Sequence, residues 1–271
     1  MTKYSPSSSY YFRLIPYHRV LQLMVIFSFL GLVMTGMPLK FSYASWAVSL
    51  SRFLGGFETA RFAHRFFAVI TFIYFIMHLA IVRKKKGVFW GPESMVPQPK
   101  DIRELYQHFR WFIGLGAKPR FDRWTYWEKF DYWAVFWGVA IIGVSGLIMW
   151  LPELFTRVFP GWIINVALIV HSDEALLATG FIFTVHFFNT HFRPGKFPLD
   201  PVIFTGRVSE EELIKERPLE YERLVREGRL ESLRADPPPA WMTNTARAIG
   251  FTALGVGLIL VVLIAISLLS Y

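Results

Sequence analysis

Two pairs of histidines within apolar segments are the residues of this chain best suited to chemistry. His64 and His78 are 14 residues apart, and His171 and His186 are 15 apart. An α-helix rises about 1.5 Å per residue, so each pair lies roughly on one helix face with its members about 21 Å apart along the axis. In a hydrocarbon layer about 30 Å thick, each pair then places one histidine near each surface.

Histidines at these depths indicate a cofactor. Ionisable side chains inside a membrane are costly, and they usually mark a function. Two helices with histidines at matched depths can hold two stacked haems, each iron taking one imidazole from each side. The chain has no Cys, which excludes disulfides, Cys-ligated iron–sulfur clusters and covalent c-type haem attachment. Any haem is therefore expected to be b-type and non-covalent.

Long apolar segments must position these histidines. The chain has 271 residues, of which 54% are hydrophobic and 18% aromatic, a composition typical of an integral membrane protein. We predict an all-α integral membrane fold, with a four-helix haem-binding bundle in residues 1–200 and a fifth, packing helix in 247–271. The predicted spans are about 17–37, 62–82, 130–151, 163–190 and 247–270. The first is read as a retained helix rather than a signal peptide.

The basic residues predict the orientation of these spans. With the N-terminus inside, segments 1–20, 83–129 and 191–247 are cytoplasmic and hold 24 of the 29 Lys and Arg residues. This distribution follows the positive-inside rule, so the net charge of +9 reflects topology and not nucleic-acid binding. The C-terminal Tyr271 is then expected outside.

The cytoplasmic segments are expected to be partly helical. A surface helix is predicted over 100–113, with His108 exposed on it. The charged segment 201–246 is predicted to contain two helices, the first opened by a capping box at Ser209–Glu212 and the second covering 218–232. Aromatic residues cluster at the entry to the third span, and either an aromatic belt or a quinone pocket explains them. They are Trp124, Tyr126, Trp127, Tyr132 and Trp133.

His64 and His171 are the natural ligands of one outer haem. Arg61 and Arg65 flank His64 and are expected to pair with the haem propionates, although snorkelling arginines around an interfacial histidine are the alternative. Ser172–Glu174 follow His171. Their acids either bond the imidazole N–H or contact an outer partner.

His186 should bind the inner haem, and its partner is open. His18 and His78 both have suitable depth. His191, five residues beyond His186, is about 140° away from it on an α-helix, which favours proton exchange with quinone or an interfacial position. A third haem on His18, His78 or His191 is a further alternative.

At this point the chain resembles a known family, the di-haem cytochrome b subunits of membrane-bound formate dehydrogenases, nickel–iron hydrogenases and thiosulfate reductases. The resemblance covers roughly residues 12–200, and the four histidines in this order make it fairly specific. The matching pieces are Tyr17-His18-Arg19 followed by Thr35-Gly36, Ala60-Arg61-Phe62-Ala63-His64-Arg65, Phe136-Trp137 through Ser145-Gly146-Leu147-Ile148-Met149-Trp150-Leu151-Pro152, and His171 through His186 with Phe187-Phe188.

The resemblance implies an outer haem on His64 and His171, and an inner haem on His18 and His186. It also implies a menaquinone site near the inner start of the third span. There Thr125 and Glu128 lie in a segment that lacks the family's Asn and Gly. His78 is a second departure from the family pattern. It makes the second and fourth spans look similar to cytochrome b of the bc-type complexes, where both haems lie between two helices. In that arrangement His78 would replace His18 as the inner-haem ligand.

The expected function is electron transfer between a quinone pool, menaquinone or ubiquinone, and a periplasmic partner through two b-type haems. The chain would be the electron-transfer subunit of a quinone-linked oxidoreductase complex in the bacterial inner membrane. A multihaem c-type cytochrome or an iron–sulfur protein is the expected neighbour. The rival readings are a histidine-lined transition-metal transporter, which predicts acidic or Met ligands at mid-membrane depth, and a cofactor-free membrane anchor.

Overall fold

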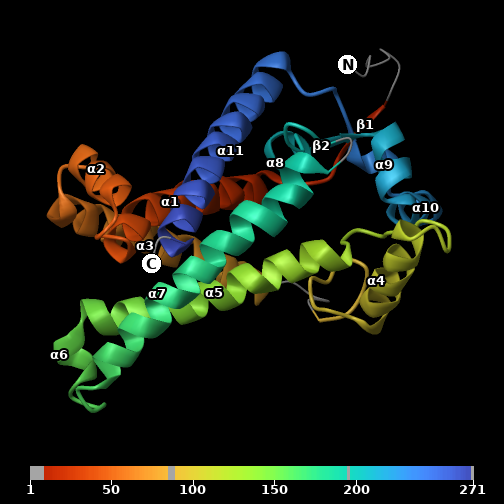
Figure 1. Ribbon diagram of the computed structural model, residues 1–271. Helices are drawn as coiled ribbons and strands as arrows, with labels where there is room; N and C mark the ends of the chain where they lie inside the picture. The colour runs from red at the N-terminus through yellow and green to blue at the C-terminus, as the bar shows by residue number, and fades with distance from the viewer. Residues whose placement is uncertain (1–8, 85–88, 194–195, 270–271) are drawn as a thin grey trace. The chain divides into compact units, whose positions relative to one another are not determined.

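The computed structural model describes residues 9–84, 89–193 and 196–269, and its helices and strands are labelled in Figure 1. Within these residues, five helices are long and apolar enough to cross a membrane, and the chain is a multi-pass membrane protein. The five are α1 (Pro16–Lys40), α3 (Phe57–Val82), α5 (Tyr126–Trp150), α7 (Ile163–Phe181) with its continuation to Phe192, and α11 (Ala240–Leu269).

These helices confirm the five predicted spans and extend three of them at the N-terminal end. α3, α5 and α11 begin four to seven residues before the predicted apolar segments. Hydropathy marks only the residues that suit hydrocarbon, whereas backbone hydrogen bonding continues into the polar first turns. The fourth span also differs from a plain α-helix, because α7 is followed by the π-helical turns η1 (Ile182–His186) and η2 (Phe188–Phe192).

The described residues form two compact units. The helical unit comprises Val20–Ala80, Val135–Asp200 and Arg247–Tyr271, and the sheet unit comprises Met1–Arg19, Ile81–Ala134 and Pro201–Ala246. The short helices α2 (Ser45–Phe53) and α6 (Pro152–Phe155) belong to the helical unit. The sheet unit contains α4 (Pro99–Phe112), α8 (Val202–Thr205), α9 (Glu210–Glu216), α10 (Pro218–Arg226), the 3₁₀ turn η3 (Glu231–Leu233) and three strands.

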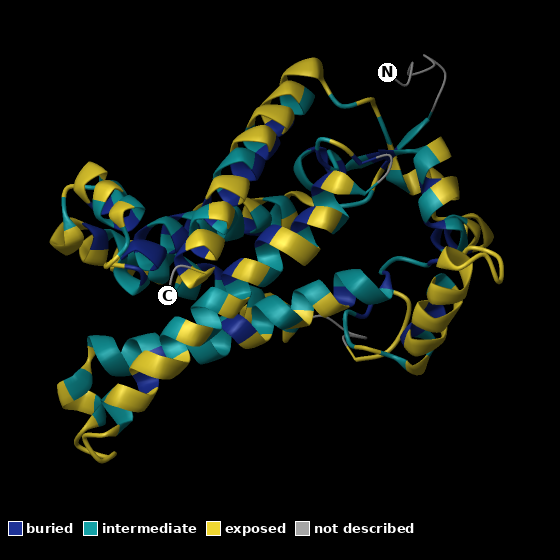
Figure 2. Cartoon of the chain, in the orientation of Figure 1, coloured by how far each residue is buried: buried dark blue, intermediate teal, exposed yellow. Residues whose placement is uncertain are grey.

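The core of the helical unit joins α1, the fourth span and α11. Val33 and Met37 of α1 are buried in one cluster with Phe183 and Phe187 of the fourth span, and α11 completes it with Leu260 and its neighbours. Many other apolar side chains on these helices are exposed, as Figure 2 shows along α7 and α11. Exposed apolar surface on long helices is what a lipid environment accepts. The fifth span therefore packs against the first and fourth spans, in line with its predicted role as a packing helix.

The small sheet corrects the all-α prediction. Strands β1 (Tyr10–Phe12), β2 (Arg207–Ser209) and β3 (Arg234–Ala235) form an antiparallel sheet in the order β2-β1-β3. Tyr11 pairs with Val208 on one side and with Arg234 on the other. Strands of two or three residues are too short to show an alternating pattern, and their partners are about 200 residues away in sequence, so composition could not reveal them.

The two predicted helices of the charged segment are present, and one is shorter than expected. The hydroxyl of Ser209 caps α9 by accepting a hydrogen bond from the Glu212 amide at 3.3 Å, which confirms the predicted N-terminus. α10 ends at Arg226 rather than at 232. Gly228 adopts φ +65°, a left-handed conformation that ends helices readily because glycine has no Cβ.

A buried carboxylate links three distant segments of the sheet unit. Glu220 is about 1% exposed, and its side chain contacts Arg13 at 3.4 Å and Arg123 at 2.7 Å. Burial alone would raise the pKa of Glu220, but the two guanidinium groups outweigh it and lower that pKa. Arg13 also donates to the Arg123 carbonyl at 2.6 Å. The network therefore fastens the N-terminal strand, the segment before α5 and α10 to one another.

Glu104 on α4 is a buried carboxyl group whose pKa is raised, whereas that of Glu220 is lowered. Burial raises its pKa to about 7 from 4.5, nearby Asp101 and Asp122 raise it further, and Lys100 and Lys129 oppose them. Its folded-state pKa lies above the ordinary value, so the folded chain holds this proton more tightly. We expect stability to fall as pH rises from about 4.5 to about 7, and to be insensitive to this group at higher pH.

Glu104→Gln should remove that part of the pH dependence and raise the thermal unfolding midpoint above pH 7, by about 2–4 °C for each kcal/mol gained. Unfolding curves of both proteins in detergent across this pH range provide the measurement. Glu231→Gln, at an exposed position of the same unit, is the matched control and should leave the pH profile unchanged. If the unfolding midpoints of the wild type and Glu104→Gln depended on pH in the same way, the raised pKa of Glu104 would be contradicted.

Candidate functional site

His64 of α3 and His171 of α7 meet inside the helical unit. Their ring centres are 6.1 Å apart and the ring planes are inclined at 73°. His64 lies two turns into α3 and His171 two turns into α7. The structure thus brings together the two histidines that the sequence paired by depth.

Hydrogen bonds fix which nitrogen each ring leaves free. The Nδ1 atom of His171 lies 2.9 Å from the Ile142 carbonyl oxygen, which can only accept, so Nδ1 carries the proton. The Nδ1 atom of His64 lies 2.9 Å from the hydroxyl oxygen of Thr35. That hydroxyl donates its own hydrogen to the Gly31 carbonyl at 2.7 Å, so it accepts from His64. Both rings therefore keep the Nε2 lone pair for a metal ion.

Two glycines give these rings their space. A Cβ atom at Gly36 would lie 3.0 Å from Cε1 of His64, and one at Gly146 would lie 3.1 Å from Cε1 of His171. Ser145 adds a hydroxyl 3.3 Å from Nδ1 of His171. Each glycine thus lies directly against one imidazole.

The spacing of the rings suits one iron between them. With about 2 Å from the metal to each nitrogen and about 1 Å from nitrogen to ring centre, two imidazoles on opposite sides of an iron have centres about 6 Å apart. The observed 6.1 Å agrees with this value, and it is also an ordinary distance for a T-shaped ring contact. Hydrogen bonds to Nδ1 that fix the tautomer and orientation of each ring are typical of metal-binding histidines.

The charged residues near this pair have partners. Arg61 pairs with Glu58 on the surface of α3, and the guanidinium of Arg65 lies 5.4 Å from the centre of the Trp150 ring. Asp173 accepts from Lys40 at 2.8 Å. The N–H of His171 is thus bonded to the Ile142 carbonyl and not to the acids that follow it, which corrects one of the sequence alternatives.

The remaining histidines lie in different parts of the chain. His78 is half-buried on α3, and His186 is half-buried in η1 of the helical unit. His18 belongs to the sheet unit near the start of α1, where the Tyr17 ring contacts it edge-on at 5.5 Å. The ligand set of the second, inner haem therefore stays a prediction.

His191 differs from its sequence prediction. The predicted separation of about 140° between His191 and His186 assumed a regular α-helix. The segment between them is π-helical, and each residue of a π-helix turns through a smaller angle about the helix axis. The imidazole is buried, and its Nδ1 donates to the Pro198 carbonyl at 2.6 Å. His191 thus also leaves Nε2 available, and no pattern in the sequence signalled the Pro198 contact.

Thr125 and Glu128 form a capping box at the start of α5. The amide and hydroxyl of Thr125 both donate to Oε2 of Glu128 at 2.8 Å, and the Glu128 amide donates to the Thr125 hydroxyl at 3.3 Å. Oε1 of Glu128 accepts from Arg217 at 2.8 Å. Both carboxylate oxygens of Glu128 accept hydrogen bonds, so Thr125 and Glu128 have a structural role. Their predicted role in binding quinone stays a prediction.

His108 is packed rather than exposed, contrary to its prediction. Its ring stacks on Phe112 with centres 4.7 Å apart, and its Nδ1 lies 2.9 Å from the Tyr126 hydroxyl. Phe121 and Trp127 complete this aromatic cluster. Some aromatic residues before the third span therefore serve to hold α4 in place.

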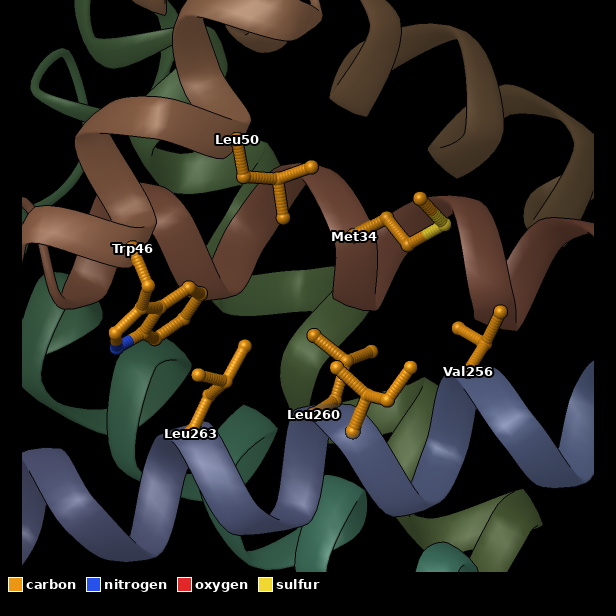
Figure 3. Close-up of a pocket in the computed structure, with 7 residues that line it drawn as sticks. Met34, Trp46, Leu50, Val256, Leu260 and Leu263 are labelled. Atoms are coloured by element: carbon orange, nitrogen blue, oxygen red, sulfur yellow. The ribbon is translucent and has the colours of Figure 1, made fainter.

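A pocket of about 220 Å³ on the helical unit lies away from these polar residues. It is lined by apolar side chains of α1, α2 and α11, and Figure 3 shows Trp46, Met34 and Leu260 turned toward it. The indole N–H of Trp46 donates to Ser267 at 2.7 Å. The lining holds no acid, base or nucleophile that could carry out chemistry.

Within the described residues, no three or more His, Asp or Glu side chains gather where they could share a metal ion. The His64–His171 pair is thus the arrangement best suited to bind a cofactor. Comparison of the sequence with models of known protein families finds no match, and none of the curated proteins matches it significantly.

Proposed function

We propose that this chain is a membrane-embedded b-type cytochrome subunit that carries electrons between the quinone pool and a redox partner. The observation that carries the proposal is the His64–His171 pair, with ring centres 6.1 Å apart and each Nδ1 hydrogen-bonded to a neighbour. His64 and His171 would hold a haem through their Nε2 atoms, and the haem would supply the other nitrogen ligands of its iron.

The chain's own residues would hold and tune such a haem. Haem bound between α3 and α7 would supply one-electron redox chemistry within the membrane. Thr35 and Ile142 hold the imidazole planes through Nδ1, which would raise the basicity of Nε2 toward a bound iron. Gly36 and Gly146 leave room for the rings. Arg61, now paired with Glu58, and Arg65, now over the Trp150 ring, would have to exchange these contacts to pair with the propionates.

A second b-type haem is proposed on His186, with His18 or His78 as its other ligand. In the proposed orientation, with the N-terminus in the cytoplasm, His18, His78 and His186 would lie on the cytoplasmic side and the His64–His171 pair on the periplasmic side. Menaquinone or ubiquinone would react near the cytoplasmic side, with His191, Thr125 and Glu128 as the nearest candidates in the sequence. A periplasmic multihaem cytochrome or an iron–sulfur subunit would be the partner.

Haem quantitation of the purified chain tests this function and assigns the second ligand. The proposal expects two b-type haems per chain by pyridine-haem assay, with a reduced-minus-oxidised spectrum of bis-histidine type. Loss of one haem in His18→Ala but not in His78→Ala assigns His18, and the reverse result assigns His78. Three haems in the wild type would mean that both ligate. A haem-free chain after expression with ample haem would refute the proposal.

A further inference from the structure

Helix α4 of the sheet unit has an exposed apolar face. On a helical wheel of 100° per residue this face spans about 120°, as wide as the stripe that an amphipathic helix normally buries. Phe109 is 61% exposed and Phe112 is 69% exposed. The members of the face are Ile102, Leu105, Tyr106, Phe109, Phe112 and Ile113.

A different side of α4 packs against its own unit. Asp101 and Glu104 are buried, and His108 stacks within the aromatic cluster described above. These three lie at least 20° from the edge of the apolar face and on one side of it, by the same wheel of about 100° per residue. Apart from Phe112, whose ring stacks on His108 at the edge of the face, the apolar face is therefore not the surface through which α4 contributes to the core of the sheet unit.

Two contacts fasten α4 to the first turn of a membrane span. Lys129 donates to both carboxylate oxygens of Asp101, at 3.0 and 2.8 Å, and His108 contacts the Tyr126 hydroxyl at 2.9 Å. Asp101 and His108 are about 10 Å apart along α4, but Tyr126 and Lys129 are only about 4.5 Å apart along α5. α4 is thus steeply inclined to α5 and lies beside its first turn; Figure 1 shows the two helices near this point.

The charges on α4 are sorted between its sides. Its two acids, Asp101 and Glu104, are buried, whereas Arg103 and Arg110 are exposed and Lys100 is half-buried. Within the described residues of α4, the exposed charges are therefore all positive. A helix with an apolar face flanked by Lys and Arg suits the headgroup region of a membrane that contains anionic lipid.

We propose that α4 lies in the headgroup region of the bilayer, with its apolar face toward the acyl chains and its basic residues toward anionic headgroups. The occupant of the face is lipid rather than another protein, because the ion pair with Lys129 and the contact with Tyr126 keep α4 at the membrane edge of α5. This assignment stands independently of haem binding.

Site-directed spin labelling tests the proposal, and the absence of Cys in the natural chain makes it direct. Single cysteines are introduced into the full chain as Leu105→Cys, Phe109→Cys and Gln107→Cys, and the labelled proteins are placed in lipid nanodiscs. Ile76→Cys on α3, where the native side chain is 64% exposed, is the reference for a lipid-facing site. Accessibility to oxygen, which concentrates in lipid, is compared with accessibility to a water-soluble nickel chelate.

The ratio of oxygen to nickel accessibility should be severalfold higher at Leu105 and Phe109 than at Gln107, approaching the value at Ile76. High nickel accessibility at Phe109 would show a water-exposed face and overturn the proposal. Low accessibility to both reagents would show a face covered by protein and would overturn it equally. If the Phe109→Cys chain misfolds, the same comparison is made with Leu105→Cys.

The charge component has its own measurement. Adding phosphatidylglycerol to phosphatidylcholine nanodiscs should lower nickel accessibility at Leu105 and Phe109, as α4 settles deeper. The paired substitution Arg103→Gln with Arg110→Gln should abolish that response while leaving the Ile76 reference unchanged. An unchanged lipid response in this variant would refute the role of the basic residues.

Discussion

If the proposed function holds, His171→Ala should remove one of the two proposed b-type haems from the purified chain, and His64→Ala should remove the same one. The rings of these residues are 6.1 Å apart, the distance at which both can bind one iron, so loss of either leaves a single axial ligand. The α-band of one haem should disappear, and pyridine-haem assay should fall by about half. His108→Ala is the matched control, because that imidazole lies in an aromatic cluster of the sheet unit, and it should retain both haems.

A graded version of this experiment separates ligand loss from general misfolding. Gly146→Val forces side-chain atoms against Cε1 of His171, where even a Cβ would lie at 3.1 Å, and should lower haem content or shift the redox potential of the same haem. Gly138→Val lies on the same helix, at a position whose added Cβ would meet no described atom within 4 Å, and should behave as wild type. Identical effects of the two substitutions would contradict the assigned position of the ring.

Lys129→Met should destabilise the sheet unit strongly. Lys129 is 2% exposed and Asp101 is 6% exposed, and the ammonium donates to both oxygens of the carboxylate. Removing the cation leaves a buried carboxylate without its partner, a change that typically costs about 3–5 kcal/mol. Thermal unfolding midpoints in detergent at neutral pH provide the test.

The matched controls use the charge partner and an exposed ion pair. Asp101→Asn combined with Lys129→Met removes both charges and should recover much of the lost stability. Glu231→Gln breaks an exposed pair with Arg234 and should cost less than about 1 kcal/mol. A similar, small loss for Lys129→Met and Glu231→Gln would show that the buried pair does not stabilise the unit.

The amino-acid sequence alone determined the five spans and the pairing of His64 with His171. Spans are readable because hydrocarbon thickness sets a minimum run of apolar residues, which is a property of consecutive positions. The depth of a histidine in the membrane follows from the number of residues between it and the end of its span. The depths of His64 and His171 could therefore be compared from the sequence. The N-terminus of α9 was equally readable, because the capping bond of Ser209 joins residues three apart.

Only the tertiary structure decided the features that depend on distant partners. Tyr11 pairs with Val208, Lys129 meets Asp101 across 28 residues, and Ile142 offers a backbone carbonyl to His171. A carbonyl is present at every residue, so no residue type marks this partner. Thr35 could have been suspected from the Thr35-Gly36 motif, but its bond to His64 required α1 beside α3. The sequence therefore specified which side chains could bind a cofactor, and packing between helices fixed their tautomer and orientation, because those depend on contacts that no local pattern encodes.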